Sequence, residues 1–376
     1  MAKITEIRSL DQLDSLRLVW RSLLQQTPNA TFFQSLDWLE VFWRHHGADQ
    51  QLRVLVVSSG SEVIGILPLT VVTESTGVGP VRFLTYPLQD WGSFFGPIGP
   101  NPTATLMAAM RYLNTAPRDW DVLDLRWVDP ETDRGRTRQA MTMAGLRPQQ
   151  QPWMEGAVVE LPDTWDEYWQ GRPRRWRENI RRSQRRLEDL GEVTYVRYRP
   201  AGIAHGDADP RWDLFDACVE IARRSWQSDV TNGNTLCSPE VIEFLRDAHE
   251  AAVRVGTLDL NLLLVDGRPV AFTYNYQTEG RVFGLRKGFD PEFRAGSPGV
   301  VLERMMFEDG IRRGDVRYDL GVGALASKRH WISREVRSQR MTHFPRTGVK
   351  AQALRLKRWY QDNFGDMDAL VAARSA

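Results

Sequence analysis

The order of the predicted elements repeats along the chain, and this repeat constrains the fold more than any other sequence feature. Each half contains a predicted β-hairpin, in which two apolar runs flank a short turn, Ser59-Gly60-Ser61 in the first half and Asp266-Gly267-Arg268 in the second. In both halves a third strand, a loop rich in glycine, a helix and a last strand follow. The last strands share a pattern, Asp-Val followed by Asp-Leu, at 121–125 and 315–320. The sequence therefore predicts a duplicated unit.

This unit predicts an α/β (α+β) protein in which each half is a mixed, mainly antiparallel sheet flanked by helices. A length of 376 residues suits two or three domains. The segment 149–152, Gln-Gln-Gln-Pro, is the predicted boundary, which gives a first domain over 1–152 and a second over 153–376. A single irregular α/β domain is the alternative.

Composition narrows the class of protein. The net charge of +1 argues against a DNA-binding protein, and no apolar stretch is long enough to cross a membrane. The first residues, Met-Ala-Lys-Ile-Thr-Glu, lack the pattern of a signal peptide, and the two cysteines lack metal-ligand spacing. We therefore expect a cytoplasmic protein without a membrane anchor. We also expect no metal site, because His45-His46 has no Cys or carboxylate partner at ligand spacing.

The loop before the helix of the second half has the features of a phosphate site. Ser297 is a suitable N-cap and Pro298 suits the first helical position. The unpaired N–H groups of a helix N-terminus bind phosphate, and Arg294 adds a positive charge. Arg294 has a structural alternative, in which it pairs with Asp290 or Glu292 and fastens the turn. The predicted donor-binding residues are Gly288, Phe289, Arg294, Gly296, Ser297, Gly299 and Val300.

The segment Arg294-Ala295-Gly296-Ser297-Pro298-Gly299 resembles the pyrophosphate loop of GNAT-superfamily acetyltransferases, with Ser297 in place of the first glycine. Over most of its length the chain is similar to the CelD-like acetyltransferases of cellulose and exopolysaccharide synthesis, relatives of the FemAB-type transferases. The resemblance implies two tandem GNAT-like acyl-CoA N-acyltransferase domains that use acetyl-CoA or another acyl-CoA. The similar segments are Phe32 to Leu39, Leu187 to Gly191, Gly288 to Pro291, Ser297 to Gly299 and Lys328 to Trp331.

The corresponding loop of the first half, Gly96 to Pro102, differs in its chemistry. It carries three prolines, each of which lacks a backbone N–H, and no arginine opens it. We therefore expect the first half to bind no CoA. It either supports the fold or forms one wall of the acceptor cleft.

A predicted helix near 174–190 carries most of the local positive charge of the chain. Eight arginines lie between Arg172 and Arg186. Arg174, Arg177, Arg181 and Arg185 share one row at helical spacing, which predicts an anion site for acceptor phosphate, CoA 3′-phosphate or an anionic polymer. A solvated charged face is the alternative. We assign Arg177, Arg181 and Arg185 to substrate binding.

Candidate acid–base residues lie at the end of the last strand of the second half. Asp319 ends this strand beside the expected donor cleft, and Lys328 follows in a loop. Both are predicted to be catalytic, because amine attack on a thioester requires a proton acceptor. Tyr274 and Tyr276 share one face of a strand, and together with Trp331 they are predicted to contact substrate.

Three functions are compatible with these features. The first is acyl transfer from acyl-CoA to an amine or hydroxyl acceptor, a small molecule or glycan precursor handled with the exopolysaccharide machinery. The second is FemAB-type transfer from charged tRNA, which the arginine-rich helix permits. The third is a non-catalytic scaffold in exopolysaccharide assembly, which the departures in the pyrophosphate loop permit.

Overall fold

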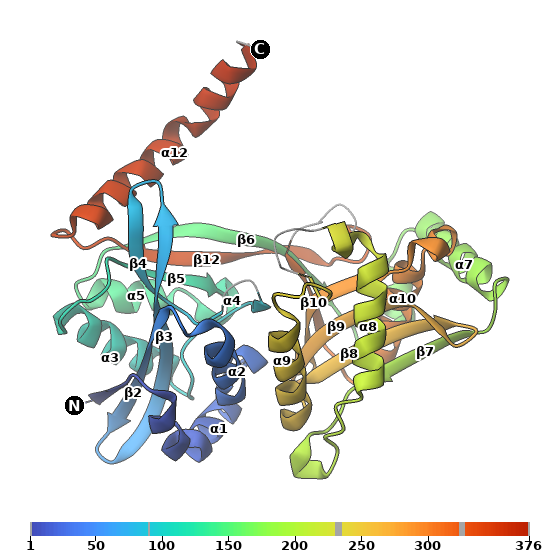
Figure 1. Ribbon diagram of the computed structural model, residues 1–376, viewed down its shortest axis with the longest axis horizontal. Helices are drawn as coiled ribbons and strands as arrows, with labels where there is room; N and C mark the ends of the chain where they lie inside the picture. The colour runs from blue at the N-terminus through green and yellow to red at the C-terminus, as the bar shows by residue number, and fades with distance from the viewer. Residues whose placement is uncertain (1, 89–90, 230–234, 323–327, 375–376) are drawn as a thin grey trace.

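The computed structural model describes residues 2–88, 91–229, 235–322 and 328–374. Within these ranges twelve strands form one sheet, in the order β1-β2-β3-β4-β5-β12-β6-β11-β10-β9-β8-β7 (Figure 1). The strands of the first half occupy one end of this sheet and those of the second half occupy the other. The predicted mixed α/β fold, with helices flanking a mainly antiparallel sheet, is confirmed.

The first half contains the predicted hairpin and the predicted third strand, helix and last strand. The strands are β1 (Ala2–Ile7), β2 (Gln50–Ser59), β3 (Glu62–Thr76), β4 (Gly79–Thr85) and β5 (Val122–Val128). The helices are α1 (Arg17–Gln25), α2 (Leu36–His46), α3 (Pro102–Thr115), α4 (Pro130–Asp133) and α5 (Arg136–Met143). Alternation along β2 sends Leu52, Val54 and Val56 toward the core beneath α1, and Leu55 toward the opposite core.

The second half repeats this order. Its strands are β6 (Pro148–Glu160), β7 (Val193–Tyr198), β8 (Leu258–Val265), β9 (Arg268–Thr278), β10 (Arg281–Phe289), β11 (Arg317–Val322) and β12 (Arg334–His343). Its helices are α6 (Trp165–Gln170), α7 (Arg174–Glu188), α8 (Trp212–Arg224), α9 (Ile242–Val255), α10 (Pro298–Arg312) and α12 (Val349–Arg374). β10 pairs in parallel with β11 as β4 does with β5, so the two halves share one topology.

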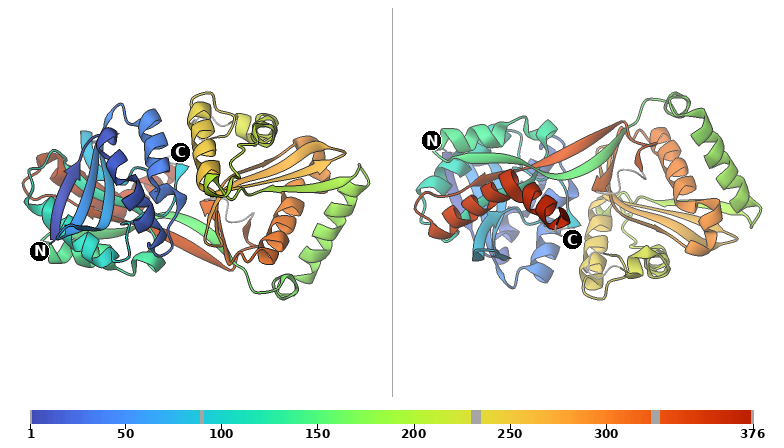
Figure 2. Two further views of the ribbon diagram at one scale, coloured as in Figure 1. Left: turned by 90° about the horizontal axis from the view of Figure 1, so that it is seen from below. Right: turned by 90° about the horizontal axis from the view of Figure 1, so that it is seen from above.

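The two halves exchange their last strands. β6 follows the first half but pairs with β11 through Gly156 to Glu160, and β12 follows the second half but pairs with β5 through Gln339 to His343. β6 and β12 also pair with each other from Arg334↔Val158 to His343↔Pro148. Figure 2 shows both strands running from one half into the other. The predicted boundary at residue 152 lies inside β6, and the division into domains 1–152 and 153–376 stays a prediction.

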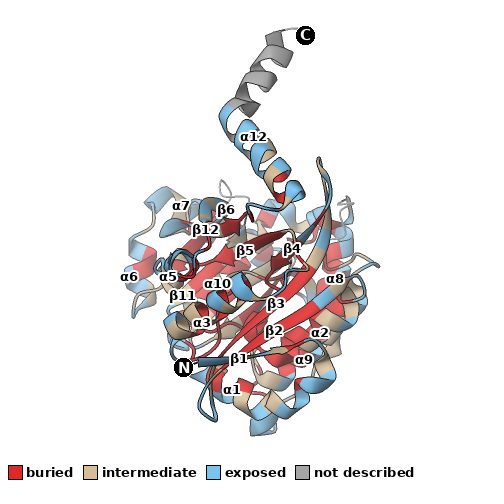
Figure 3. Ribbon diagram, turned by 90° about the vertical axis from the view of Figure 1, so that its left-hand side faces the viewer, coloured by how far each residue is buried: buried red, intermediate tan, exposed pale blue. Residues whose placement is uncertain are grey.

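Helices cover both faces of the sheet in the second half. α8 and α9 lie on one face, and α7 and α10 lie on the other (Figure 2). α9 also packs on α2 of the first half, where the Phe244 ring lies edge-on to Trp38 at 5.7 Å. The strands form the buried interior, while α12 projects from the body (Figure 3).

A buried ion cluster fastens β12 to the first half. Asp124 of β5 is fully buried and accepts hydrogen bonds from Arg126 Nε at 2.9 Å, Arg340 Nε at 3.1 Å and Thr342 Oγ1 at 2.7 Å. Burial alone would raise the pKa of Asp124, but Arg340 and Arg126 outweigh it and hold the pKa at about 2. Since Arg340 and Thr342 belong to β12, these contacts join segments from opposite ends of the chain.

We expect Asp124→Asn to lower the free energy of unfolding by about 3–5 kcal/mol, because Arg340 loses its carboxylate partner in a largely buried site, while Arg126 keeps its ion pair with Glu74. Urea unfolding at pH 7 measures this loss. The stabilisation that comes from a lowered pKa is complete above pH 3.8 and is lost as the pH falls toward 2. The difference in free energy of unfolding between wild type and variant should therefore shrink between these two pH values. Asp11→Asn, at an exposed position, is the matched control. Equal stability of the two variants at pH 7 would contradict the role of the cluster.

Candidate active site

A cleft opens where two parallel strands of the second half separate. β10 and β11 pair only from Arg281↔Arg317 to Phe283↔Asp319. Beyond this point β11 bulges between Asp319 and Val322, and Gly321 adopts a left-handed conformation with φ of 72°. A cleft of about 380 Å³ lies beside the separated strands. Separated strands leave backbone groups unpaired, so this region can bind an extended substrate through the main chain.

Both faces of the sheet contribute to the cleft. On the face covered by α10, Thr273 and Asn275 of β9 line it together with side chains of that helix. On the opposite face its walls come from the first half. These residues are Trp91, Gly92, Ser93, Phe94 and Trp127. The cleft therefore reaches from the α10 side of the second half to the first half, and a donor and an acceptor can enter it from different sides.

The sequence did not predict which residues of the first half line the cleft. It did predict, as one of two roles for that half, that it could form a wall of the cleft. Two of the lining residues carry a backbone signal that only the structure shows. Phe94 and Trp127 have positive φ angles of 51° and 62°, which are costly for residues other than glycine. Phe95 N donates to Trp127 O at 3.0 Å and joins the two segments. Strain of this kind persists only where the surrounding structure enforces it.

Asp319 lies in the cleft, as predicted. Its side chain is 6% exposed, and its Oδ1 accepts a hydrogen bond from Gly321 N at 2.8 Å. Burial raises the pKa of Asp319 to about 6, and the Gly321 N–H, Arg317 and Lys328 offset only part of this rise. A carboxyl group with a pKa of about 6 can accept and release a proton near neutral pH.

Lys328 lines the same cleft. Its Nζ donates to Gly321 O at 2.9 Å and to Val322 O at 3.2 Å, so it holds the bulge that follows Asp319. Burial, and then the charge of Lys287, lower the pKa of Lys328 to about 8. The structure thus brings together the two predicted catalytic residues.

The three aromatic residues assigned to substrate lie elsewhere. Tyr274 and Tyr276 do share one face of β9, but that face packs under α8 and α9, and both rings are at most 2% exposed. The other face of β9 lines the cleft. Trp331 is also buried, edge-on to Trp176 at 4.3 Å. It anchors the turn from Lys328, since Trp331 N donates to Lys328 O at 2.8 Å.

The predicted pyrophosphate loop forms a short 3-10 helix, Pro291–Gly296, followed by α10. Ser297 stands at the N-cap position, but its prediction as a side-chain cap is wrong. Its φ of 46° is left-handed, and its side chain makes no capping hydrogen bond. A left-handed backbone explains why the related motif has glycine here. Gly288 is buried, with Phe289 beside it at the end of β10.

Gly296 and Gly299 have different surroundings. A Cβ on Gly296 would lie 2.3 Å from Leu187 Cδ2, so this glycine allows α7 to pack against the loop. A Cβ on Gly299 would meet only Phe289, at 3.8 Å. The Val300 N–H already donates to Ser297 O at 3.1 Å, so it is not the free donor that was predicted. Open space beside Gly299 leaves the first turn of α10 accessible to a ligand.

Arg294 is exposed, and no described residue forms a hydrogen bond or an ion pair with its side chain. The two carboxylates that were its alternative, structural partners pair with a different arginine. Asp290 and Glu292 both pair with Arg268, the former at 2.7 Å. The position of Arg294 therefore favours contact with a ligand over fastening of the turn.

The arginine-rich helix α7 runs beside this loop. Arg186 Nη1 donates to Ala295 O at 3.1 Å. Arg181 and Arg185 are exposed, as a binding role requires. Arg177 differs, because it donates to Gln170 Oε1 at 2.7 Å and to Arg172 O at 3.2 Å, which gives it a structural role at the start of the helix.

The corresponding loop of the first half has its backbone donors engaged. Ile98 N donates to Ile66 O and Gly99 N donates to Thr27 Oγ1, both at 2.8 Å. Asn101 caps α3 through Ala104 N at 3.0 Å. With these donors paired and with prolines at other positions, the loop offers little for a phosphate to bind.

Part of the chain is similar to a known protein family. Residues 174–329 match the family model described as an acetyltransferase (GNAT) domain. No curated protein sequence matches the chain. The matched range includes α7, the pyrophosphate-like loop, Asp319 and Lys328.

Solved structures share the fold of the whole chain. FemX aligns with a TM-score of 0.60 and 12% identity over 96% of this chain and 99% of FemX. The C-terminal domain of an Agrobacterium fabrum protein, provisionally named a lysylphosphatidylglycerol synthetase, aligns with a TM-score of 0.53 and 12% identity over 94% and 97%. A conserved protein of unknown function from Bacteroides thetaiotaomicron aligns with a TM-score of 0.51 and 12% identity over 92% and 100%. At such identities the likeness concerns the fold alone.

Two features of residues 2–88, 91–229, 235–322 and 328–374 concern metals and membranes. Among these residues no group of three or more His, Cys, Asp or Glu side chains is arranged to hold a metal ion. Within the same ranges no helix has both the length and the apolar character to cross a membrane.

We expect Asp319→Asn to stabilise the protein at pH 8 by at most about 3 kcal/mol, because a pKa raised from 3.8 to about 6 means that folding disfavours the ionised carboxylate. The stabilisation associated with the raised pKa of Asp319 is fully present below pH 3.8 and is lost as the pH rises through 6. The two proteins should therefore be equally stable near pH 4 and differ above pH 6. Denaturant unfolding at both pH values measures this, and Asp11→Asn is again the control. A less stable variant at pH 8 would mean that Asp319 serves the fold.

Proposed function

We propose that the protein is an N-acyltransferase that transfers an acyl group from acyl-CoA to an amine or hydroxyl acceptor. One observation carries this proposal: the cleft between β10 and β11 holds Asp319 and Lys328 at the point where the α10 side meets the first-half side. The GNAT match over 174–329 supports the same reaction class.

The donor side of the site is the first turn of α10. The residues that would hold the CoA phosphates are Arg294 and the open first turn at Gly299, with Arg181 and Arg185 of α7 beside them. Helix N-termini bind phosphate through unpaired N–H groups and the helix dipole, and arginine adds charge-assisted hydrogen bonds. Acyl-CoA supplies the thioester carbonyl that the acceptor attacks.

The acid–base chemistry falls to Asp319. The acceptor nitrogen or oxygen forms a bond to the thioester carbon, the carbon–sulfur bond breaks, and the leaving thiolate takes up a proton. Ionised Asp319 accepts the proton that the acceptor loses. Lys328 keeps Asp319 more ionised than burial alone would allow, since its positive charge lowers the pKa of that carboxyl.

The acceptor side is the aromatic wall of the first half. Phe94 is half-buried and offers apolar ring surface, whereas Trp91 and Trp127 are 5% and 8% exposed and Arg286 lies over the Trp91 ring at 4.1 Å. Such a surface suits the apolar faces of a sugar ring as well as other flat groups. We propose a small-molecule or glycan-precursor acceptor, in cell-envelope or exopolysaccharide synthesis. The free thiols of Cys218 and Cys237 support a cytoplasmic location.

A FemAB-type reaction with charged tRNA is a second candidate. The exposed Arg181 and Arg185 of α7 favour it, because cationic side chains on a helix suit a nucleic-acid backbone. The alignment with FemX over nearly the whole chain is compatible with it at the level of fold. The non-catalytic scaffold that the substituted loop permitted has less support, since the cleft retains a carboxyl group with a pKa near neutrality.

We expect Arg294→Ala to weaken CoA binding by roughly ten- to a hundredfold, because a charge-assisted hydrogen bond contributes about 1.5–3 kcal/mol. Calorimetric titration with CoA measures this affinity. The melting temperature should not change, because the side chain is exposed and unpaired within the described residues. Arg312→Ala, at the other end of α10 and also exposed, is the matched control. If the Arg294→Ala variant kept its affinity for CoA but lost stability, Arg294 would have a structural role and the donor site would not lie at this loop.

We expect Arg181→Glu with Arg185→Glu to weaken donor binding without unfolding the chain, because both side chains lie in solvent beside the loop. Titration with CoA and filter retention of tRNA distinguish the two donors. Loss of CoA affinity alone supports the acyl-CoA reaction, and loss of tRNA retention alone supports the second candidate. Arg111→Glu with Arg138→Glu adds the same charge to exposed positions of the first half and serves as the control. Unchanged binding of both CoA and tRNA would mean that the arginines of α7 form only a solvated charged face.

A further inference from the structure

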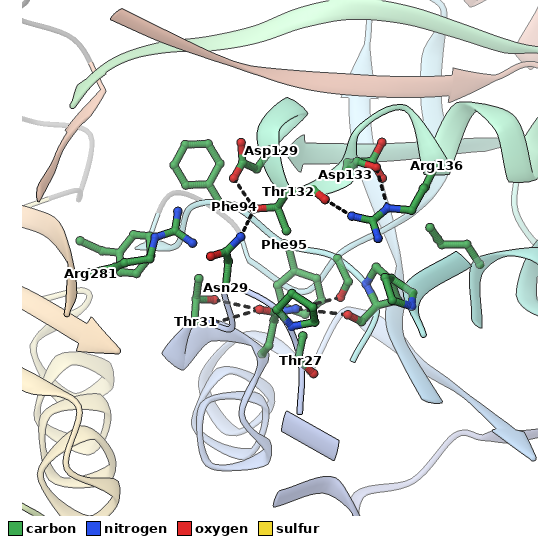
Figure 4. A pocket seen from close by; sticks show the side chains of 17 residues that line it. Thr27, Asn29, Thr31, Phe94, Phe95, Asp129, Thr132, Asp133, Arg136 and Arg281 are labelled. Carbon is green, nitrogen blue, oxygen red and sulfur yellow. Dashed lines mark hydrogen bonds between the residues drawn. The ribbon is translucent and has the colours of Figure 1, made fainter. Parts of the chain in front are cut away.

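A second, smaller cavity lies between the two halves, next to the cleft. It has a volume of about 50 Å³ and is walled by the 27–34 segment, the loop at Phe94 to Pro97, the α4 turn and the start of β10 (Figure 4). Phe94 lines both the cavity and the cleft, and the consecutive residues Phe283 and Gly284 line one each. The two spaces therefore adjoin. A volume of this size holds a compact group and excludes a nucleotide.

Arg281 of β10 reaches into this cavity (Figure 4). Its side chain is half-buried, yet no described residue forms a hydrogen bond or an ion pair with it. Its one aromatic contact is with the ring of Phe283, at 5.7 Å from the ring centroid. Burial, and then the charge of Arg317, lower the pKa of Arg281, and the nearby carboxylates of Asp129, Asp319 and Glu131 offset part of this effect without a hydrogen bond to the guanidinium, which stays protonated in a protein.

The acidic residues around the cavity do not pair with Arg281. Asp129 accepts hydrogen bonds from Glu131 N at 3.0 Å and Thr132 Oγ1 at 2.7 Å. Asp133 accepts from Thr137 N at 3.0 Å and Thr137 Oγ1 at 2.5 Å. Both carboxylates therefore serve the short helices α4 and α5. Glu131 forms ion pairs with Arg317 and Arg334.

An arginine in such a place lowers stability unless something compensates for its charge. Partial burial removes water from the guanidinium, and its five N–H donors need acceptors. Other buried or half-buried arginines of this chain are compensated in different ways. Arg197 contacts Asp259 at 2.7 Å and Asp315 at 3.0 Å, whereas Arg358 lies over two phenylalanine rings and has no ion pair among the described residues. Nearby carboxylates offset part of the charge of Arg281, but its N–H donors have no acceptor among the described residues. A ligand that brings an anionic group would supply these acceptors.

We propose that Arg281 binds a compact anionic group of the acceptor, a carboxylate or a phosphate, in the cavity between the two halves. Phe283 pairs with Asp319 in register, and Arg281 precedes Phe283 by two residues, about 7 Å along the strand. An acceptor that places its nucleophile at Asp319 and its anionic group at Arg281 therefore has these two groups only a few bonds apart. The role in acceptor selection rests on the proposed acyl transfer, whereas binding of the anion does not.

Thermal unfolding of the full-length protein in acetate, inorganic phosphate or chloride, at equal ionic strength, tests the anion site. A ligand that binds the folded state raises the unfolding temperature with its concentration. We expect wild type to gain stability in acetate or phosphate beyond chloride. The larger effect identifies the acceptor group as carboxylate or phosphate. Arg281→Met should weaken this binding by about ten- to a hundredfold, because charge-assisted hydrogen bonds are lost.

Two controls separate a binding role from a structural one. Arg138→Met removes an exposed charge outside the cavity and should keep the anion effect. In chloride, Arg281→Met and Arg281→Gln should be at least as stable as wild type, since each removes an unpaired guanidinium. Lower stability of both variants, an anion effect that survives both, or no effect in wild type would overturn the proposal. Anion binding without acyltransferase activity would leave the site intact and refute only the proposed function.

Discussion

The exchange of last strands between the two halves is the constraint on which the rest of the structure depends. β6 completes the sheet of the second half and β12 completes that of the first, so neither half closes its own sheet. An incomplete sheet edge is an unpaired row of N–H and C=O groups, which is costly to leave without a partner. Because both exchanged strands also pair with each other, the halves are held in one relative position. A cleft with walls from both halves requires this fixed relation.

Two aspartates with the same sequence pattern show how surroundings decide chemistry. Asp124 and Asp319 each occupy the second aspartate of the Asp-Val…Asp-Leu pattern, and both are buried. Arg126 and Arg340 surround the first and hold its pKa at about 2, whereas the second lacks such a pair and has a pKa of about 6. The first half thus uses its aspartate to fasten β12, and the second half keeps its aspartate available in the cleft.

The two glycine-containing loops diverge in the same way. In the first half the loop donates its N–H groups to Ile66 and Thr27, and its neighbours Trp91 and Phe94 line the cleft of the other half. In the second half Arg294 and the first turn at Gly299 remain open. In the proposed function, a duplicated fold therefore supports a donor site in one copy, while the other copy supplies the facing wall. Arg281 lies where these two halves meet and faces the small cavity between them.

The sequence by itself determined the elements whose signals are local. Hairpins, helices and the repeated order followed from apolar periodicity and turn residues, while the catalytic roles of Asp319 and Lys328 stay a prediction. The sequence pattern led to the wrong prediction that Tyr274 and Tyr276 face the cleft. The alternation of side chains along a strand shows which residues share a face but does not show which face lines the cleft. Only the tertiary structure decided the exchange of β6 and β12, the wall from the first half and the unpaired state of Arg281. Each depends on contacts between residues far apart in the chain, and no local propensity encodes which distant strand or charge will be the partner.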